Sequence, residues 1–257
     1  MMMNIITRIS LICFSVLLFA GCKKELQLLA PTTTVSSDQA KLKINYNSAY
    51  TVSNPVQLKL NNNRVSNLIT SRTPFPGGGF NTGGGSGGDY LAVRPGLTSM
   101  LVSIPKFNTT VDSVVLYSTN LTLEANKTYT AHITDTGANT KVVLLEDNLT
   151  NHDTMSRYKF VNLMPNVPFI DLYFGTQLVA ANIPYLGASN TFDLPLTNPQ
   201  PAWAIREAGA APTSTALATY ASGNTNLRGR VYTAFAVGYK GQTTVQRKPY
   251  ISFLLNR

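Results

Sequence analysis

A two-residue alternation of apolar and polar side chains is the feature that most constrains the fold of this chain. Residues 56–60 have the sequence Val-Gln-Leu-Lys-Leu, and residues 128–133 follow the same alternation. Because successive side chains of a β-strand point to opposite faces of a sheet, this pattern predicts half-buried strands. Turn-forming residues separate nearly all of the other apolar segments, and we therefore expect an all-β fold. Further strands are predicted over residues 42–46, 90–94, 100–104, 114–117, 141–146, 158–163, 169–174, 202–206, 231–239 and 251–255.

The composition agrees with this expectation. Charged residues make up 13% of the chain and hydrophobic residues 44%, a balance typical of a turn-rich β protein. The formal net charge is +9, which removal of Arg8 with the predicted signal peptide lowers by one to +8. The cations are scattered, with no run longer than Lys23-Lys24 or Arg247-Lys248, and this argues against a nucleic-acid partner. Attraction to anionic glycans or lipids stays open.

The order of the predicted strands repeats. Lys41-Leu-Lys-Ile-Asn45 is matched by Tyr158-Lys-Phe-Val-Asn162, and Lys127-Thr-Tyr-Thr-Ala131 is matched by Arg230-Val-Tyr-Thr-Ala234. The period is about a hundred residues, the size of one β-sandwich. We therefore expect two tandem antiparallel β-sandwich domains, either immunoglobulin-like or transthyretin-like. The predicted segments are domain 1 over residues 41–147 with a Gly-rich insertion at 76–88, a linker at 148–156, and domain 2 over residues 157–257.

The amino terminus has the sequence pattern of an export signal. Arg8 precedes an almost purely apolar run over residues 9–20, and the small pair Ala20-Gly21 stands just before Cys22. This segment resembles the lipobox of bacterial lipoproteins, in which such a cysteine is acylated and becomes the first residue of the mature protein. We expect a signal peptide over residues 1–21, lipidation of Cys22 and a disordered tether over residues 22–40.

The resemblance to lipoproteins also implies a cellular location. Lys23 rather than Asp follows Cys22, which favours the outer membrane, with acyl chains on Cys22 as the membrane partner. The periplasmic face and the cell surface stay open as orientations, because Glu25 alone represents the acidic export tag of some Bacteroidota lipoproteins. Cys13 lies in the segment to be removed, so no disulfide is expected in the mature chain. No oligomeric state is predicted.

The second half of the chain resembles a known family. The segments Arg157-Tyr-Lys-Phe-Val-Asn-Leu-Met-Pro165, Ile170-Asp-Leu-Tyr173, Leu178-Val-Ala180 and Val231-Tyr-Thr-Ala-Phe235 are similar to the domain of unknown function 4397. The similarity is strongest over residues 157–239 and fainter in the first half. It implies exported or lipid-anchored β-sandwich domains, often in tandem, and it implies no activity.

Candidate metal and triad residues are few. His132 is expected on the polar face of its strand and His152 in the linker, so the two histidines form no pair with ligand spacing. His152-Asp153 precedes Ser156, yet no G-x-S-x-G motif exposes that serine. We predict no metal, no cofactor and no catalytic residue.

Acidic pairs offer a weak case for glycoside hydrolysis. The available acids are Glu146 with Asp147, and Asp171 with Asp193. Asp171 alternates with apolar neighbours on a predicted strand, so an outward-facing, solubilising side chain is expected.

The glycines of residues 76–88 suggest a phosphate loop, but the Lys-Ser/Thr ending and a following helix are missing. A flexible hairpin insertion is the better interpretation, and closure of this loop on a ligand stays open as the alternative.

Aromatic side chains provide the last candidates. A stacking platform for sugar rings is conceivable, although a position in the core is favoured because the strand after Tyr232 is apolar on both faces. These aromatic candidates are Trp203, Tyr220, Tyr232, Tyr239 and Tyr250. Together the observations predict a lipid-anchored, non-catalytic envelope protein that binds a glycan or an envelope protein or has a structural role. The alternative is an exported hydrolase or glycan-processing enzyme with an unrecognised site.

Overall fold

A computed structural model describes residues 38–50 and 54–257. The predicted signal peptide, the lipidation site Cys22 and residues 22–37 of the predicted tether lie outside the described residues. Strand β1 already begins at Ala40, which the sequence had assigned to the tether. Among the described residues, no helix is long and apolar enough to cross a membrane.

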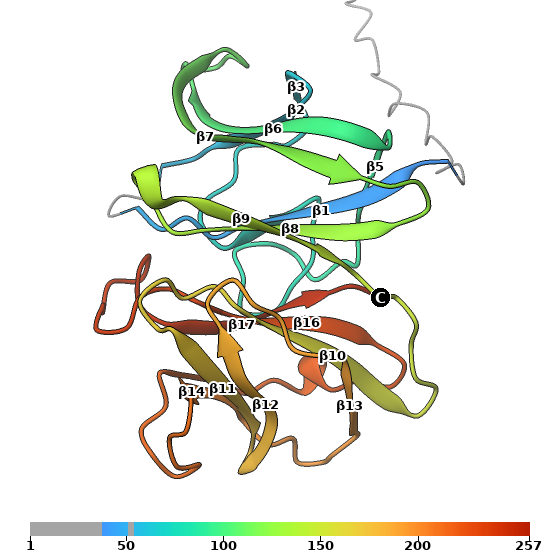
Figure 1. Ribbon diagram of the computed structural model, residues 1–257, viewed down its shortest axis with the longest axis vertical. Coiled ribbons are helices and arrows are strands. Elements are labelled where there is room, and N and C mark those ends of the chain that lie inside the picture. The colour runs from blue at the N-terminus through green and yellow to red at the C-terminus, as the bar shows by residue number, and fades with distance from the viewer. Residues whose placement is uncertain (1–37, 51–53) are drawn as a thin grey trace, which may run out of the picture. The chain divides into compact units, whose positions relative to one another are not determined.

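The all-β prediction is confirmed, and the strands fall into two sets along the chain (Figure 1). The first set comprises β1 (Ala40–Tyr46), β2 (Gln57–Leu60), β3 (Asn63–Arg64), β4 (Thr73–Phe75), β5 (Leu91–Val93), β6 (Gly96–Pro105), β7 (Asp112–Leu123), β8 (Thr128–Thr134) and β9 (Lys141–Glu146). The second set comprises β10 (Met155–Asn162), β11 (Phe169–Phe174), β12 (Gln177–Pro184), β13 (Phe192–Pro195), β14 (Trp203–Glu207), β15 (Ala218–Tyr220), β16 (Val231–Val237) and β17 (Tyr250–Leu255).

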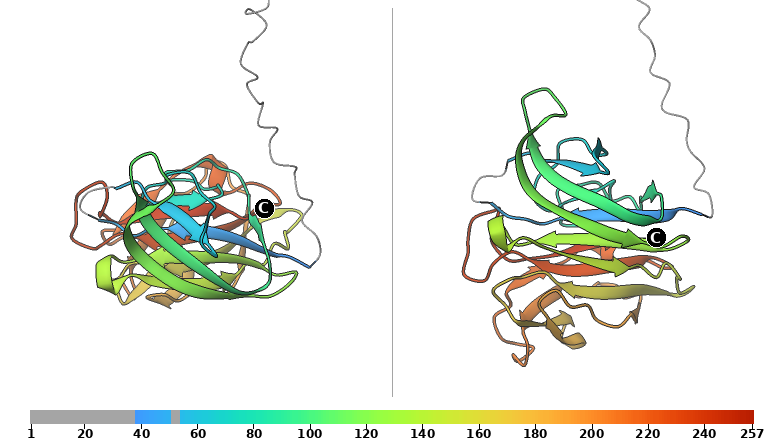
Figure 2. Two further views of the ribbon diagram at one scale, coloured as in Figure 1. Left: turned by 90° about the horizontal axis from the view of Figure 1, so that it is seen from above. Right: turned by 45° about the horizontal axis from the view of Figure 1, so that its top comes forward.

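Each set forms two sheets, and the two sets share one topology. In the first set the sheets have the orders β4-β1-β8-β9, with β5 also pairing β1, and β3-β2-β6-β7. In the second set the orders are β13-β10-β16-β17 and β12-β11-β14-β15. Apart from β5, which has no counterpart in the second set, the positions correspond one to one, so the repeat found in the sequence appears again in the strand order. Figure 1 shows the four sheets stacked as layers, and Figure 2 shows the long β6–β7 hairpin projecting beyond them.

The expectation of purely antiparallel sheets is wrong at one pair in each set. Strand β1 runs parallel to β8, and β10 runs parallel to β16. Parallel neighbours need a long crossover connection, and here the chain crosses through the other sheet of the same set before returning. Period-two alternation carries no information about strand direction, which is why the sequence could not indicate this.

The register corrects the sequence alignment of the two repeats by one residue. Lys41 lies opposite Thr128, and Arg157 lies opposite Val231, so Lys41 corresponds to Arg157 and not to Tyr158. A shift of one residue exchanges the two faces of a strand. The corrected register makes Lys43 the equivalent of Lys159.

Each set encloses its own hydrophobic core. The core of the first set includes Leu42, Leu58, Val102 and Ile133. The core of the second set is built around Trp203, which is fully buried and whose indole N–H donates to the Thr225 hydroxyl across 3.0 Å. Two sheets facing one another around one core make each set a β-sandwich, called the first and the second sandwich below.

A third buried layer joins the two sandwiches, whose described residues form one compact unit. Val161, Phe235 and Leu254 of the second sandwich pack against Val143 and Leu145 of the first. Strand β8 is therefore buried along its whole length, and the prediction that it is half-buried is wrong. The alternation identified the polar face correctly but could not show that another sheet covers that face.

The Gly-rich insertion lies against the second sandwich, and the prediction of a flexible hairpin is wrong. Phe80 donates a backbone hydrogen bond to Phe253 across 2.7 Å and accepts one from it across 2.9 Å. A Cβ atom on Gly79 would lie 2.4 Å from the carbonyl oxygen of Phe253. Glycine is required because the backbone of the insertion comes so close to the free edge of β17.

Candidate functional site

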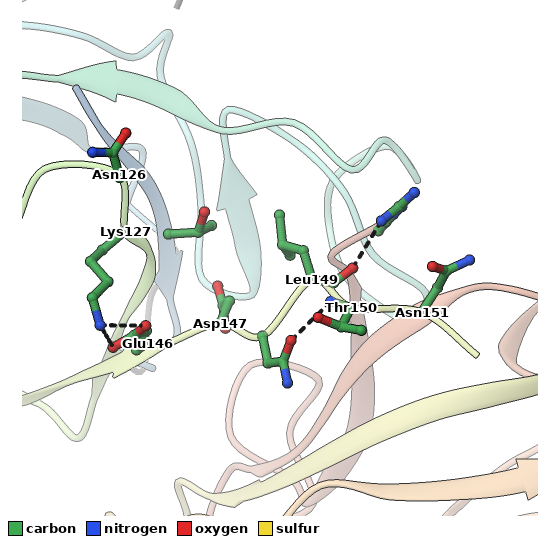
Figure 3. A pocket seen from close by; sticks show the side chains of 10 residues that line it. Asn126, Lys127, Glu146, Asp147, Leu149, Thr150 and Asn151 are labelled. Atoms are coloured by element: carbon green, nitrogen blue, oxygen red, sulfur yellow. Dashed lines mark hydrogen bonds and ion pairs between the residues drawn. The ribbon is translucent and has the colours of Figure 1, made fainter. Parts of the chain in front are cut away.

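A polar hollow of about 620 Å³ lies beside the segment that connects the two sandwiches (Figure 3). Lys127 pairs with Glu146 across 2.8 Å, and an Arg257 guanidinium nitrogen donates to the carbonyl oxygen of Leu149 across 3.2 Å. These charged groups already have partners within the hollow, which makes it less suited to bind a ligand. The lining residues are Asn126, Lys127, Thr128, Glu146, Asp147, Asn148, Leu149, Thr150, Asn151 and Arg257.

The two acids in this hollow do not act as a pair. Glu146 is bound to Lys127, whereas the buried Asp147 carboxylate accepts hydrogen bonds from the Thr130 hydroxyl at 2.6 Å and the Tyr90 hydroxyl at 3.1 Å. Burial raises the pKa of Asp147 above its usual range. Asp147 therefore belongs to the layer between the sandwiches.

The second candidate pair is also separate. Asp171 is buried and accepts backbone hydrogen bonds from Asn182 at 2.6 Å and Gly209 at 2.9 Å, so the prediction of an outward-facing side chain is wrong. The β11–β12 ladder has a register irregularity beside Asp171, where backbone N–H groups need another acceptor. Asp193 instead binds Arg157 across 2.8 Å, and this hydrogen bonding lowers the pKa of Asp193.

The histidines are likewise far from a catalytic arrangement. His132 is fully buried, not on an exposed polar face, and its Nδ1 is 2.9 Å from the Asn45 amide nitrogen. Burial lowers the pKa of His132 to about 3. His152 Nδ1 accepts from the Thr154 backbone at 3.3 Å, while the Ser156 hydroxyl donates to the carbonyl oxygen of Leu227 at 2.8 Å. Within residues 38–50 and 54–257, no group of three potential metal ligands occurs.

The aromatic candidates divide between the core and the surface. Trp203 and Tyr232 are buried in the core of the second sandwich, as the sequence favours. Tyr239 lies beside Arg247 and donates to Asp135 across 2.8 Å. Tyr220 and Tyr250 remain partly exposed and line one hollow.

This hollow, called the Tyr250 groove, has a volume of about 570 Å³. It forms where the edge strand β15, the segment between β16 and β17 and the Gly-rich insertion meet, so both sandwiches contribute to it. Its lining contains no carboxylate and no histidine. The lining residues are Asn81, Leu217, Ala218, Thr219, Tyr220, Gln242, Thr243, Lys248, Pro249 and Tyr250.

Two cations contact the Tyr250 ring: Lys248, which lines the groove, and Arg72, which lies outside the lining. The Arg72 guanidinium carbon lies 3.6 Å from the ring centroid, and the Lys248 Nζ lies 5.1 Å from it. The Arg72 guanidinium also donates a long hydrogen bond of 3.5 Å to the carbonyl oxygen of Asn81. Contact with an aromatic face holds each cation in position without neutralising its charge.

The electrostatics of the groove are therefore one-sided. Four ion pairs occur among the described residues, and neither Arg72 nor Lys248 takes part in any of them. Burial lowers the pKa of Arg72, since the guanidinium is partly removed from water. A negatively charged group in the groove would supply the counter-charge that the protein does not.

Sequence reasoning found Tyr220 and Tyr250 but missed Arg72 and Asn81. These two residues belong to the first sandwich and are 178 and 169 residues from Tyr250, by the subtractions 250 − 72 and 250 − 81. No local pattern links them to β17. The dipeptide Arg247-Lys248 is the one signal near this site in the sequence, and a run of two cations does not indicate a binding site.

Comparison with known proteins gives one family. The family model described as domain of unknown function (DUF4397) matches residues 53–171. The match spans most of the first sandwich, strand β10 and the start of β11, and it includes the segment 157–165 that carried the resemblance. It lies mainly in the first half of the chain, whereas the sequence predicts the strongest similarity over residues 157–239. It ends before residues 178–180 and 231–235. No curated protein matches the chain.

Proposed function

Because the chain is DUF4397-like over residues 53–171 and that family has no assigned activity, we propose a function on the basis of the Tyr250 groove. The chain is a non-catalytic module that binds acidic glycans. The ligand occupies the Tyr250 groove and carries a carboxylate, sulfate or phosphate. Acyl chains on Cys22 hold the module at the outer membrane.

The observation that carries this proposal is the position of Arg72 and Lys248 on the ring of Tyr250. Both cations lack a carboxylate partner among the described residues, and Arg72 is partly desolvated. Hydrogen bonds to charged groups contribute about 1.5–3 kcal/mol each, more than those between neutral groups. An anionic ligand group is therefore favoured over a neutral one.

The remaining lining suits a sugar. Gln242 offers a side-chain amide, and Thr219 and Thr243 offer hydroxyl groups for hydrogen bonds with ligand hydroxyls. Asn81 offers its side-chain oxygen, since its amide nitrogen donates to the carbonyl oxygen of Ile251 across 2.9 Å. Tyr220 supplies an apolar surface from which the C–H groups of a sugar ring can exclude water. A volume of about 570 Å³ lies within the range of ligand sites.

The alternative function, a hydrolase, receives less support. Glycoside hydrolysis needs two carboxyl groups that flank the scissile bond. Asp171 and Asp193 have separate partners, as do Glu146 and Asp147, and no acid lines the Tyr250 groove.

Titration of the purified full chain with two sets of oligosaccharides tests the proposed function. Oligogalacturonides and heparin oligosaccharides are the acidic probes, and malto-oligosaccharides of the same length are the neutral control. We expect saturable binding of at least one acidic probe, weakened by added salt because the contacts are ionic. Equal binding of acidic and neutral probes, or no binding of either, would exclude the proposal.

The proposed anchor has its own test. Cells are grown with labelled palmitate, and the label recovered with the wild-type chain is compared with that recovered with Cys22→Ala. We expect the label in the wild type only. Equal labelling of both proteins would show that Cys22 is not the acylated residue.

A further inference from the structure

A lysine is completely buried between the two sandwiches. Lys43 of β1 has no exposed surface, and its Nζ donates to the carbonyl oxygen of Leu255 across 2.7 Å. The same Nζ lies 4.6 Å from the centroid of the Tyr90 ring. An ammonium group has three N–H donors, yet Leu255 is the one hydrogen-bond acceptor found for Lys43 among the described residues.

This environment makes the neutral amine of Lys43 more accessible than that of an exposed lysine. Burial lowers the pKa of Lys43 to about 8, although Asp147 and Asp89 act in the opposite direction. A neutral amine has a free electron pair and is a nucleophile, whereas an ammonium group is not.

The carbonyl group that Lys43 contacts belongs to the peptide bond between Leu255 and Asn256. Asn256 is buried, and its amide nitrogen donates to the Thr233 hydroxyl across 3.2 Å. Its side-chain oxygen, Oδ1, is buried without a hydrogen-bond partner. A buried carbonyl oxygen without a donor is costly, so the side-chain oxygen of Asn256, unlike its amide nitrogen, is left unsatisfied.

A buried carboxyl group completes the cluster. Asp147 is buried, contacts Thr130 and Tyr90, and lines the same small internal hollow as Asn256. Tyr90 in turn interacts with both Asp147 and Asn256. Burial raises the pKa of Asp147, so its acid form is favoured over that of an ordinary aspartate.

We propose that Lys43 and Asn256 are joined by an intramolecular isopeptide bond, with Asp147 as the proton carrier. The bond connects β1, the first strand, to the end of β17, the last strand, and so links the two sandwiches covalently. This inference is independent of the proposed glycan function, since none of these residues lines the Tyr250 groove.

The reaction is balanced without an oxidant or a further reactant. The electron pair of the Lys43 amine attacks the Cγ of Asn256, and Asp147 in its acid form donates a proton to the amide. The new C–N bond forms, the bond between Cγ and Nδ2 breaks, and the leaving nitrogen departs as ammonia. Asp147 accepts the proton that Nζ loses and returns to its acid form. The product is a secondary amide and one ammonia.

Mass spectrometry of a tryptic digest of the full chain tests this proposal. The expected product is one branched peptide that joins residues 42–59, uncleaved after Lys43, to residues 248–257, with the loss of one ammonia, about 17 Da. Folded wild-type protein with separate, unmodified peptides would overturn the proposal. A branch from Lys43 to Asp147 with loss of water would overturn the choice of Asn256.

Variants test the role of each group. Lys43→Met and Asn256→Ala should yield no branched peptide, and Asp147→Asn should yield less than a tenth of the wild-type amount because no carboxyl group carries the proton. Each variant is checked for folding by its far-ultraviolet circular dichroism. If Asp147→Asn folds and forms the branch as fully as the wild type, Asp147 is not the proton carrier. Lys159→Met, which changes the equivalent lysine of the second sandwich, is the matched control and should keep the branch.

Discussion

Phe80 and Phe253 exchange two backbone hydrogen bonds, of 2.7 and 2.9 Å, although they belong to different sandwiches. The contact extends the sheet of β17 by one bridge and brings Asn81 to the Tyr250 groove. The Gly-rich insertion is thus part of the interface between the sandwiches. Both the stability of the chain and its proposed binding site depend on this contact.

The first prediction concerns Gly79, where the insertion passes closest to β17. Gly79→Ala places a Cβ atom 2.4 Å from the Phe253 carbonyl oxygen, so the two backbones must separate. We expect the free energy of unfolding, measured by urea denaturation, to fall by about 1–3 kcal/mol. Gly85→Ala is the control, because nothing lies within 4 Å of a Cβ atom there. Equal loss in both variants would contradict the close contact at Gly79.

The second prediction concerns the core of the second sandwich. Trp203 is fully buried, and its ring lies 4.6 Å from that of Phe174 and 5.0 Å from that of Tyr158. Trp203→Ala should lower the free energy of unfolding by about 3–5 kcal/mol. Phe107 in the β6–β7 hairpin is 90% exposed, so Phe107→Ala should change the free energy of unfolding by less than about 0.5 kcal/mol. If thermal or urea melts showed similar losses of stability in the two variants, the burial of Trp203 and the exposure of Phe107 would be contradicted.

The third prediction is a pH dependence caused by His132. Its folded-state pKa of about 3 is below the ordinary value of 6.5, so the unfolded chain binds a proton first as the pH falls. His132 therefore costs no stability above pH 6.5, and it destabilises the fold progressively between pH 6.5 and pH 3. The slope approaches about 1.4 kcal/mol per pH unit. In urea melts at a series of pH values, His132→Gln should have a smaller slope than the wild type. An unchanged slope would contradict neutral burial of His132.

Much of the fold is predictable because one face of most of the longer strands is strongly apolar. Strands β9 and β11 begin and end at the residues that the sequence predicts. Short edge strands such as β3 and β15 were missed, since two or three residues carry no measurable alternation. The burial of His132 was missed for a different reason, because it depends on a sheet from the other sandwich.

Less of the candidate site was predictable. Tyr220 and Tyr250 are aromatic candidates in the sequence, but only the contact between the sandwiches brings Asn81 into the groove and Arg72 onto the Tyr250 ring. Asp171 illustrates the opposite error, since its position in a strand suggested exposure while it satisfies two backbone N–H groups. Contacts between segments far apart in the sequence decide both cases.

The most direct test of the binding proposal is the affinity of single-site variants for an oligogalacturonide. Arg72→Gln and Lys248→Gln each remove one cation from the Tyr250 ring, whereas Lys141→Gln removes an exposed cation of β9 outside the groove. Isothermal titration of the full chain should give a Kd raised about tenfold or more by each of the two variants at the Tyr250 ring, and unchanged by Lys141→Gln. Equal Kd values for the wild type and all three variants would contradict binding of acidic glycans in the Tyr250 groove.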